Sequence, residues 1–72
     1  MPSDKLVRMA NQIATFFESQ PGAAADAVAA HINDFWEPRM RAQLLAHIAT
    51  GGAGLAPSVL AAAPLIRQPQ TA

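Results

Sequence analysis

The sequence predicts an all-α fold, a small bundle of three helices plus a short fourth helix and a disordered C-terminal tail. Apolar residues recur at intervals of three and four along most of the chain, which is the spacing of one face of a helix. Prolines and glycines divide this pattern into short segments, because neither residue suits a helix interior. We therefore expect a helical domain over residues 1–63 and a flexible tail over residues 64–72.

The first helix is predicted from about Asp4 to near Ser19. Ser3 can accept a hydrogen bond from a free backbone N–H of the first turn, and Asp4 complements the positive end of the helix dipole. Pro21 and Gly22 end the pattern, since proline cannot continue the hydrogen-bond ladder. The predicted apolar face consists of Leu6, Met9, Ala10, Ile13, Phe16 and Phe17.

The second helix is predicted over residues 23–35, because this segment is rich in alanine, the best helix former, and contains no breaker. A helix lined by alanine can approach its neighbour closely but buries little area per residue. Its apolar stripe is expected to be Ala24 or Ala25, Val28, Ile32 and Phe35.

The third helix is predicted to start at Pro38, where a missing N–H has no cost, and to end at Gly51 or Gly52. The connection before it, from Trp36 to Pro38, is short, so we expect the second and third helices to pack against each other. The predicted apolar side of the third helix consists of Met40, Leu44, Leu45 and Ile48.

The fourth helix is predicted from Pro57 to Ala63 and ends at Pro64. This short piece is expected to be marginal on its own. From Leu65 onward the sequence shows no periodicity and is expected to be disordered.

The composition limits how this domain can be stabilised. The chain has 72 residues, of which 51% are hydrophobic but only 6% aromatic, so few large side chains are available for a core. A core of this size rarely supplies more than roughly 3–5 kcal/mol. With no cysteine, disulfides are excluded and thiolate metal sites are disfavoured. A partner chain is therefore the expected source of additional stability.

The charge balance and hydropathy restrict the class of partner. Five basic and five acidic residues give a net charge of zero, which does not suit a protein that neutralises phosphates, so we expect no nucleic acid. No apolar run approaches the length of about 20 residues needed to span a bilayer, and the N-terminus lacks the apolar segment of a signal peptide. A cytoplasmic location without membrane contact is expected.

Candidates for catalytic or metal chemistry are few. His31 and His47 fall on different predicted helices, and the one carboxylate at helical spacing from either of them is Asp34, so ordinary surface histidines are favoured over a metal site. The serines lie in cap or terminal positions, and the carboxylates are spread along the chain without forming an acid–base pair. We therefore predict no catalytic, cofactor-binding or metal-binding residue.

The stretch NDFWEPRMR, residues 33–41, holds the most distinctive side chains. Interface energy concentrates in Trp and Arg, and arginine can bind a partner carboxylate through two parallel hydrogen bonds. Trp36 could alternatively fill the small core while Arg39 and Arg41 remain solvated, and composition does not decide between these interpretations. Arg39 and Arg41 are two residues apart, so on a helix they should point in different directions.

Three segments carry a resemblance to a known family. These are LVRMANQIATFFES at residues 6–19, VAAHINDFWEPRMRAQLLAHI at residues 28–48 and GGAGLAPSVLAA at residues 51–62. In them the chain resembles the delta subunit of the bacterial NAD-dependent, molybdenum-containing formate dehydrogenases. The combination of MANQI with FWEPRMR about twenty residues later is more specific than a generic helical pattern, and the resemblance covers most of the chain.

The resemblance implies a non-catalytic accessory subunit of a cytoplasmic enzyme complex. In such complexes the alpha subunit carries a molybdenum bis-pterin cofactor and oxidises formate to carbon dioxide. Iron–sulfur clusters then pass electrons to FMN and NAD on partner subunits. Such a complex also contains beta and gamma subunits. The lack of cysteine and of a dinucleotide-binding glycine loop agrees with an accessory role.

From the distinctive residues 33–41 and from the family resemblance, we expect the chain to dock on the catalytic alpha subunit and to stabilise it. The alternatives are a dissociable assembly factor for cofactor insertion and a free-standing helical regulator that binds a ligand. The predicted partner interface consists of Phe35, Trp36, Glu37, Pro38, Arg39, Met40 and Arg41.

Overall fold

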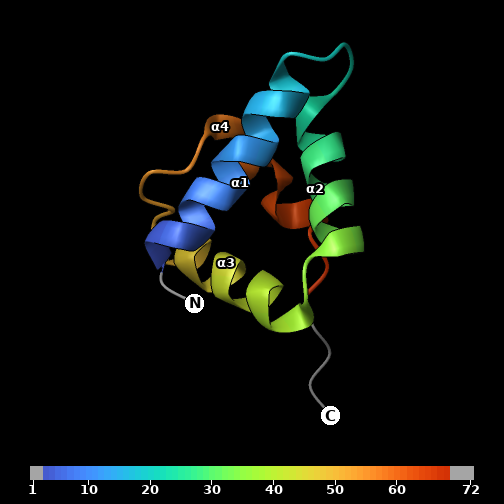
Figure 1. The fold of residues 1–72 in the computed structure, drawn as a ribbon. Coiled ribbons are helices and arrows are strands. Elements are labelled where there is room, and N and C mark those ends of the chain that lie inside the picture. Colours follow the sequence, from blue (N-terminus) through green and yellow to red (C-terminus); the bar gives the residue numbers. More distant parts are fainter. Residues whose placement is uncertain (1–2, 69–72) are drawn as a thin grey trace.

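The computed structural model describes residues 3–68 and folds them as four α-helices and a short 3-10 helix. The elements are α1 (Ser3–Glu18), α2 (Ala24–Phe35), α3 (Pro38–Ala49), α4 (Pro57–Ala62) and the 3-10 helix η1 (Ala63–Leu65). Helices α1 and α2 converge at their connecting loop, α3 crosses the open end between them, and α4 lies behind (Figure 1). Within the described residues the predicted all-α bundle is confirmed.

Proline and glycine set the helix boundaries where the sequence predicted them. Helices α3 and α4 begin at Pro38 and Pro57. At the end of α3 the backbone N–H of Gly52 donates to the carbonyl of His47 at 3.0 Å, and both Gly51 and Gly52 have positive φ. Glycine adopts this left-handed conformation without steric cost, so α3 ends within one turn of the predicted residue.

The Gly52 position should not tolerate a side chain. Its φ is +64°, and a Cβ added there would lie 2.6 Å from Cδ2 of Leu60. The left-handed backbone alone costs a non-glycine residue roughly 1–2 kcal/mol. We expect Gly52→Ala to lower the free energy of unfolding by at least that amount in chemical denaturation. When Gly52→Ala is combined with Leu60→Ala, the cost of the left-handed backbone should remain and the clash with Leu60 should disappear. If Gly52→Ala alone left the free energy of unfolding unchanged, the requirement for glycine at this position would be wrong.

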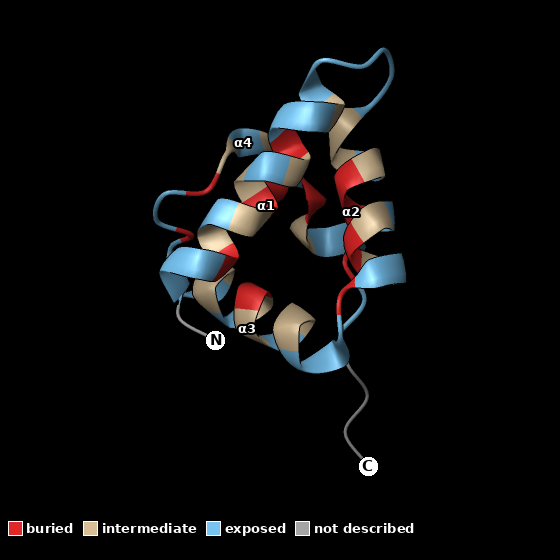
Figure 2. Cartoon of the chain, in the orientation of Figure 1, coloured by how far each residue is buried: buried red, intermediate tan, exposed pale blue. Residues whose placement is uncertain are grey.

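The core lies between α1, α2 and α4, and small residues form much of it (Figure 2). Alanines from all three helices are buried, which allows the close helix approach predicted for α2. The large side chains that are fully buried are Val28, Ile32, Leu44 and Val59. Phe35 was expected in the apolar stripe of α2, but its side chain is 74% exposed.

Helix α3 packs mainly against α1, so the prediction that α2 and α3 pack against each other is wrong. The reason is the corner between them, where Trp36 and Glu37 adopt extended backbone and turn the chain away from α2. Leu44 is the one residue of α3 that is fully buried, while Met40, Leu45 and Ile48 are half-buried against the core.

The packed unit extends beyond the predicted boundary at residue 63. Pro64 lies inside η1, and the side chain of Ile66 is buried with 4% of its surface exposed. A core poor in large side chains gains from this aliphatic residue, so the chain remains packed past the end of α4. Residues 69–72 of the predicted tail lie outside the described residues.

Two asparagines hold the α4–η1 segment by its backbone at both ends. Asn11 of α1 donates from Nδ2 to the carbonyl of Gly54 at 2.9 Å and accepts at Oδ1 from the N–H of Ala56 at 2.8 Å. Asn33 of α2 donates to the carbonyl of Leu65 at 3.1 Å and accepts from the N–H of Arg67 at 2.8 Å. The bond to Asn11 also satisfies the backbone N–H of Ala56, the N-cap residue of α4, which makes no side-chain cap of its own.

Loss of one asparagine should loosen α4. Each hydrogen bond contributes about 0.5–1.5 kcal/mol, so Asn33→Ala is expected to cost about 1–2 kcal/mol of the free energy of unfolding, because solvent can replace part of these exposed contacts. Hydrogen exchange should show faster opening of the segment from Val59 to Ile66. Asn33→Asp keeps the acceptor for Arg67 and should cost less; equal losses in both variants would contradict this account.

Candidate partner interface

The predicted interface lies at the corner between α2 and α3, where backbone geometry separates two neighbouring aromatic residues. Phe35 is the last residue of α2, and Trp36 follows with φ −86° and ψ 140°. Glu37 is also extended, as the residue before a proline prefers. As a result Phe35 is 74% exposed, whereas Trp36 is 7% exposed.

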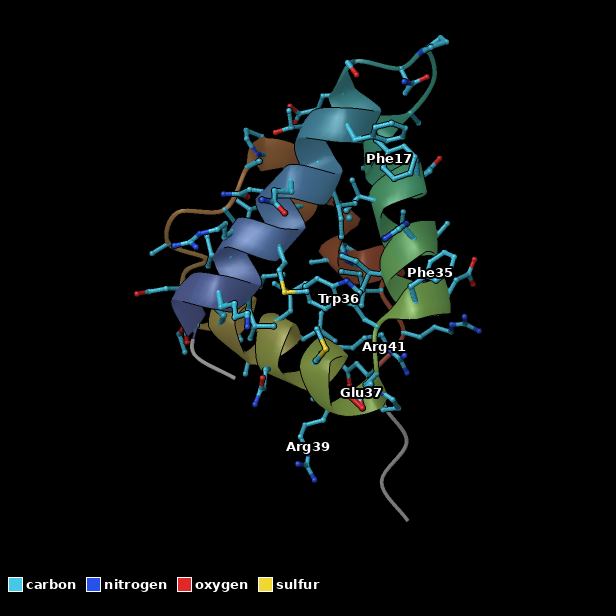
Figure 3. All side chains as sticks on the ribbon, in the orientation of Figure 1. Phe17, Phe35, Trp36, Glu37, Arg39 and Arg41 are labelled. Carbon is cyan, nitrogen blue, oxygen red and sulfur yellow. The ribbon has the colours of Figure 1, made fainter. Side chains whose placement is uncertain are left out.

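Trp36 belongs to the core of this chain. Its indole points into the bundle between α1, α2 and α3 (Figure 3). Met9 and Ile13 of α1 line the same groove as the indole. The structure therefore favours the interpretation in which Trp36 fills the small core over the one in which it anchors a partner.

The two arginines have separate surroundings, as their spacing predicted. Arg41 is half-buried and donates from Nη1 to the carbonyl of Trp36 at 2.9 Å and from Nε to the carbonyl of Arg67 at 3.0 Å. It thus joins the corner to the C-terminal segment of its own chain. Arg39 is exposed and points away from the bundle (Figure 3).

The corner consequently has a structural side and an exposed side. Trp36, Arg41 and the half-buried Met40 pack or bond within the chain. Phe35, Glu37, Pro38 and Arg39 are exposed. That the seven residues together form a partner interface stays a prediction, and only the exposed side could contact a partner without rearrangement.

A second surface, which the sequence reasoning missed, continues from Phe35 to α1. The rings of Phe35 and His31 lie 4.8 Å apart between centroids, those of His31 and Phe17 lie 6.1 Å apart, and those of Phe17 and Phe16 lie 5.0 Å apart. The rings of Phe16, Phe17 and His31 border a shallow groove between α1 and α2, here called the aromatic groove. It is lined by Met9, Gln12, Ile13, Phe16, Phe17, His31 and Trp36.

The sequence did contain a signal for this surface. Phe16 and Phe17 were both predicted on the apolar face of the first helix, but their side chains lie about 100° apart around its axis, so a narrow contact with the core can bury one of them more fully than the other. The more exposed residue is Phe16, with 58% of its surface exposed.

The polar groups that could suggest catalysis have structural contacts instead. The Nε2 of His47 lies 2.9 Å from the carbonyl oxygen of Ala53, and the hydroxyl of Ser58 donates to Glu18 at 2.6 Å. Residues 3–68 contain no group of three His, Cys, Asp or Glu side chains that could hold a metal ion. In the same range no helix has the length and apolar character needed to cross a bilayer.

The fold defines a class: small all-helical proteins, here with two phenylalanine side chains exposed on the surface. The family model of the NADH-dependent formate dehydrogenase delta subunit FdsD matches residues 5–63, and the chain belongs to this family. No individual curated protein matches it. The family confirms the resemblance seen in the sequence and makes the chain a delta subunit of an NAD-dependent formate dehydrogenase complex.

The sequence lacks the residues that iron–sulfur clusters and the dinucleotide-binding glycine motif require. Iron–sulfur clusters are held by cysteine thiolates, and the sequence has no cysteine. Its four glycines include no dinucleotide-binding motif.

Proposed function

We propose that this chain is a non-catalytic accessory subunit that docks on the molybdenum-cofactor-bearing alpha subunit of a cytoplasmic formate dehydrogenase. Docking would stabilise that subunit for the oxidation of formate to carbon dioxide, while the beta and gamma subunits complete electron transfer to NAD. The observation that carries the proposal is the family match over residues 5–63, joined to a ring at the corner, Phe35, that is 74% exposed and that no element within residues 3–68 covers.

Docking is proposed to use the exposed side of the corner. Phe35 supplies the apolar anchor, and Arg39 pairs with a carboxylate of the alpha subunit through its planar guanidinium. Trp36 and Arg41 contribute indirectly, because they hold the corner in the conformation that exposes Phe35. A subunit that binds the cofactor-loaded form preferentially shifts the population toward that form.

The test is to isolate the chain from its native cell with its bound proteins and to assay the eluate for formate-dependent NAD reduction. A large molybdenum-containing subunit recovered in constant proportion, with activity, supports the proposal. Recovery of the inactive apo subunit alone would favour a dissociable assembly factor instead. If no large partner is recovered, the proposal is wrong.

A further inference from the structure

We infer that the backbone of Arg67 positions the docking corner, because one side chain from each of the two helices that meet at the corner holds it. The bonds that Asn33 of α2 and Arg41 of α3 make to Arg67 are here called the Arg67 bridge. This inference rests on the proposed function, which makes the corner a docking surface. It adds the C-terminal part of the chain and Asn33 to the groups that docking requires.

The Arg67 bridge engages both backbone groups of one residue. The N–H of Arg67 donates to Oδ1 of Asn33 at 2.8 Å, and its carbonyl accepts from Nε of Arg41 at 3.0 Å. The preceding residue, Ile66, is buried, so the chain that leads to Arg67 is anchored in the core. Asn33 comes before the corner in the sequence and Arg41 comes after it, so the bridge spans the corner.

Arg41 connects the position of Arg67 to the corner itself. Its Nη1 donates to the carbonyl of Trp36 at 2.9 Å, while its Nε donates to Arg67. The guanidinium is planar and holds its N–H groups in fixed relative directions, so it also fixes the two carbonyl groups relative to each other. If Arg67 is released, the side chain of Arg41 loses one of two acceptors and gains rotamer freedom. The carbonyl of Trp36 is then held less firmly.

The bridge has a large effect on the corner because α2 and α3 share little direct packing. Helix α1 contacts both of them, and between them the backbone is extended at Trp36 and Glu37. The Arg67 bridge adds a second connection between the two helices. Phe35 belongs to α2 and Arg39 to α3, so a change in the angle between these helices would displace one proposed docking group relative to the other.

Two asparagine variants form a matched pair that tests this inference. Asn33 and Asn11 are both half-buried, and each donates to one backbone carbonyl and accepts from one backbone N–H, but only Asn33 binds Arg67. The full chain with Asn33→Ala or Asn11→Ala is titrated onto the formate dehydrogenase complex lacking this subunit. In the free chain, acrylamide quenching of fluorescence reports on the corner, because the single tryptophan is Trp36 and its side chain is buried.

Asn33→Ala is expected to weaken docking and to expose the indole. Loss of two hydrogen bonds shifts the equilibrium between bridged and released forms by about five- to thirtyfold, and Kd rises as the binding-competent fraction falls. We expect Kd to rise about threefold or more and the quenching of Trp36 to increase. Asn11→Ala should leave Kd within about twofold and quenching unchanged, because it loosens the other end of the α4–η1 segment.

Arg41→Lys provides a second variant if Asn33→Ala does not fold. Lysine keeps the positive charge but lacks the planar group that binds both carbonyls, so the same rise in Kd and in quenching is expected.

Equal effects of the two asparagine variants would mean a general loss of stability and would overturn the inference. A higher Kd for Asn33→Ala without greater quenching would make Asn33 a direct contact, and greater quenching without a higher Kd would separate the bridge from docking; either result also overturns it. In all these cases the unmodified chain binds, so the proposed function stands. If the unmodified chain does not bind the complex, the proposed function and the inference are both wrong.

Discussion

Replacement of Trp36 by alanine is expected to unfold the isolated chain or bring it close to unfolding. The indole is the largest side chain in the core and lies where α1, α2 and α3 meet (Figure 3). Truncation of a buried Phe or Trp to Ala costs about 3–5 kcal/mol. A domain of this size has roughly 3–5 kcal/mol in total, so little stability should remain. Because this is the single tryptophan of the sequence, unfolding must be followed by far-ultraviolet circular dichroism rather than by fluorescence.

Trp36→Phe is the matched control for that experiment. Phenylalanine keeps most of the apolar volume, so the variant should remain folded with a smaller loss of stability. If Trp36→Ala instead left the free energy of unfolding nearly unchanged and abolished retention in the formate dehydrogenase complex, Trp36 would be a partner anchor and its placement in the core would be wrong.

The two aromatic residues of the corner show where helical periodicity stops being informative. The spacing of Val28, Ile32 and Phe35 predicts one buried stripe, and the first two residues are indeed buried. At Phe35 the helix ends, and the extended backbone of Trp36 directs the next side chain into the bundle. The period of 3.6 residues per turn does not predict which of the two rings is buried, because the backbone changes from helical at Phe35 to extended at Trp36.

Helix boundaries were predictable, whereas the contacts of the polar side chains were not. Pro38, Pro57 and the glycines after α3 act through their own backbone, so their effect can be read locally. Asn11, in contrast, binds backbone groups 43 and 45 residues away along the chain. Every residue has a carbonyl group, and nothing in the local sequence identifies which one an amide side chain will reach. The packing of Ile66 beyond the fourth helix was also missed, because two aliphatic residues after a proline show no periodicity that would predict burial.

Replacement of Phe35 by serine is expected to weaken binding to the complex and to leave the isolated chain folded, whereas replacement of Trp36 by alanine is expected to unfold it. Its side chain is 74% exposed and lies at the end of α2, so the isolated chain should keep its free energy of unfolding to within about 0.5 kcal/mol. If Phe35 is an interface anchor, the variant should be retained in the complex more weakly by about 2 kcal/mol, which is close to a thirtyfold increase in Kd. Unfolding of the isolated chain and titration onto the complex lacking this subunit measure the two quantities separately.

Leu65→Ser provides the matched control, since Leu65 is a large apolar residue that is 50% exposed and lies outside both the corner and the aromatic groove. A general loss of apolar surface would weaken binding in both variants, whereas an anchor at the corner weakens it only in Phe35→Ser. Equal retention of Phe35→Ser and the unmodified chain would exclude Phe35 as the anchor and leave the charged residues of the corner to account for docking. The pair of variants therefore decides whether the exposed ring at the end of α2 contributes binding energy or is simply the side chain that the core could not accommodate.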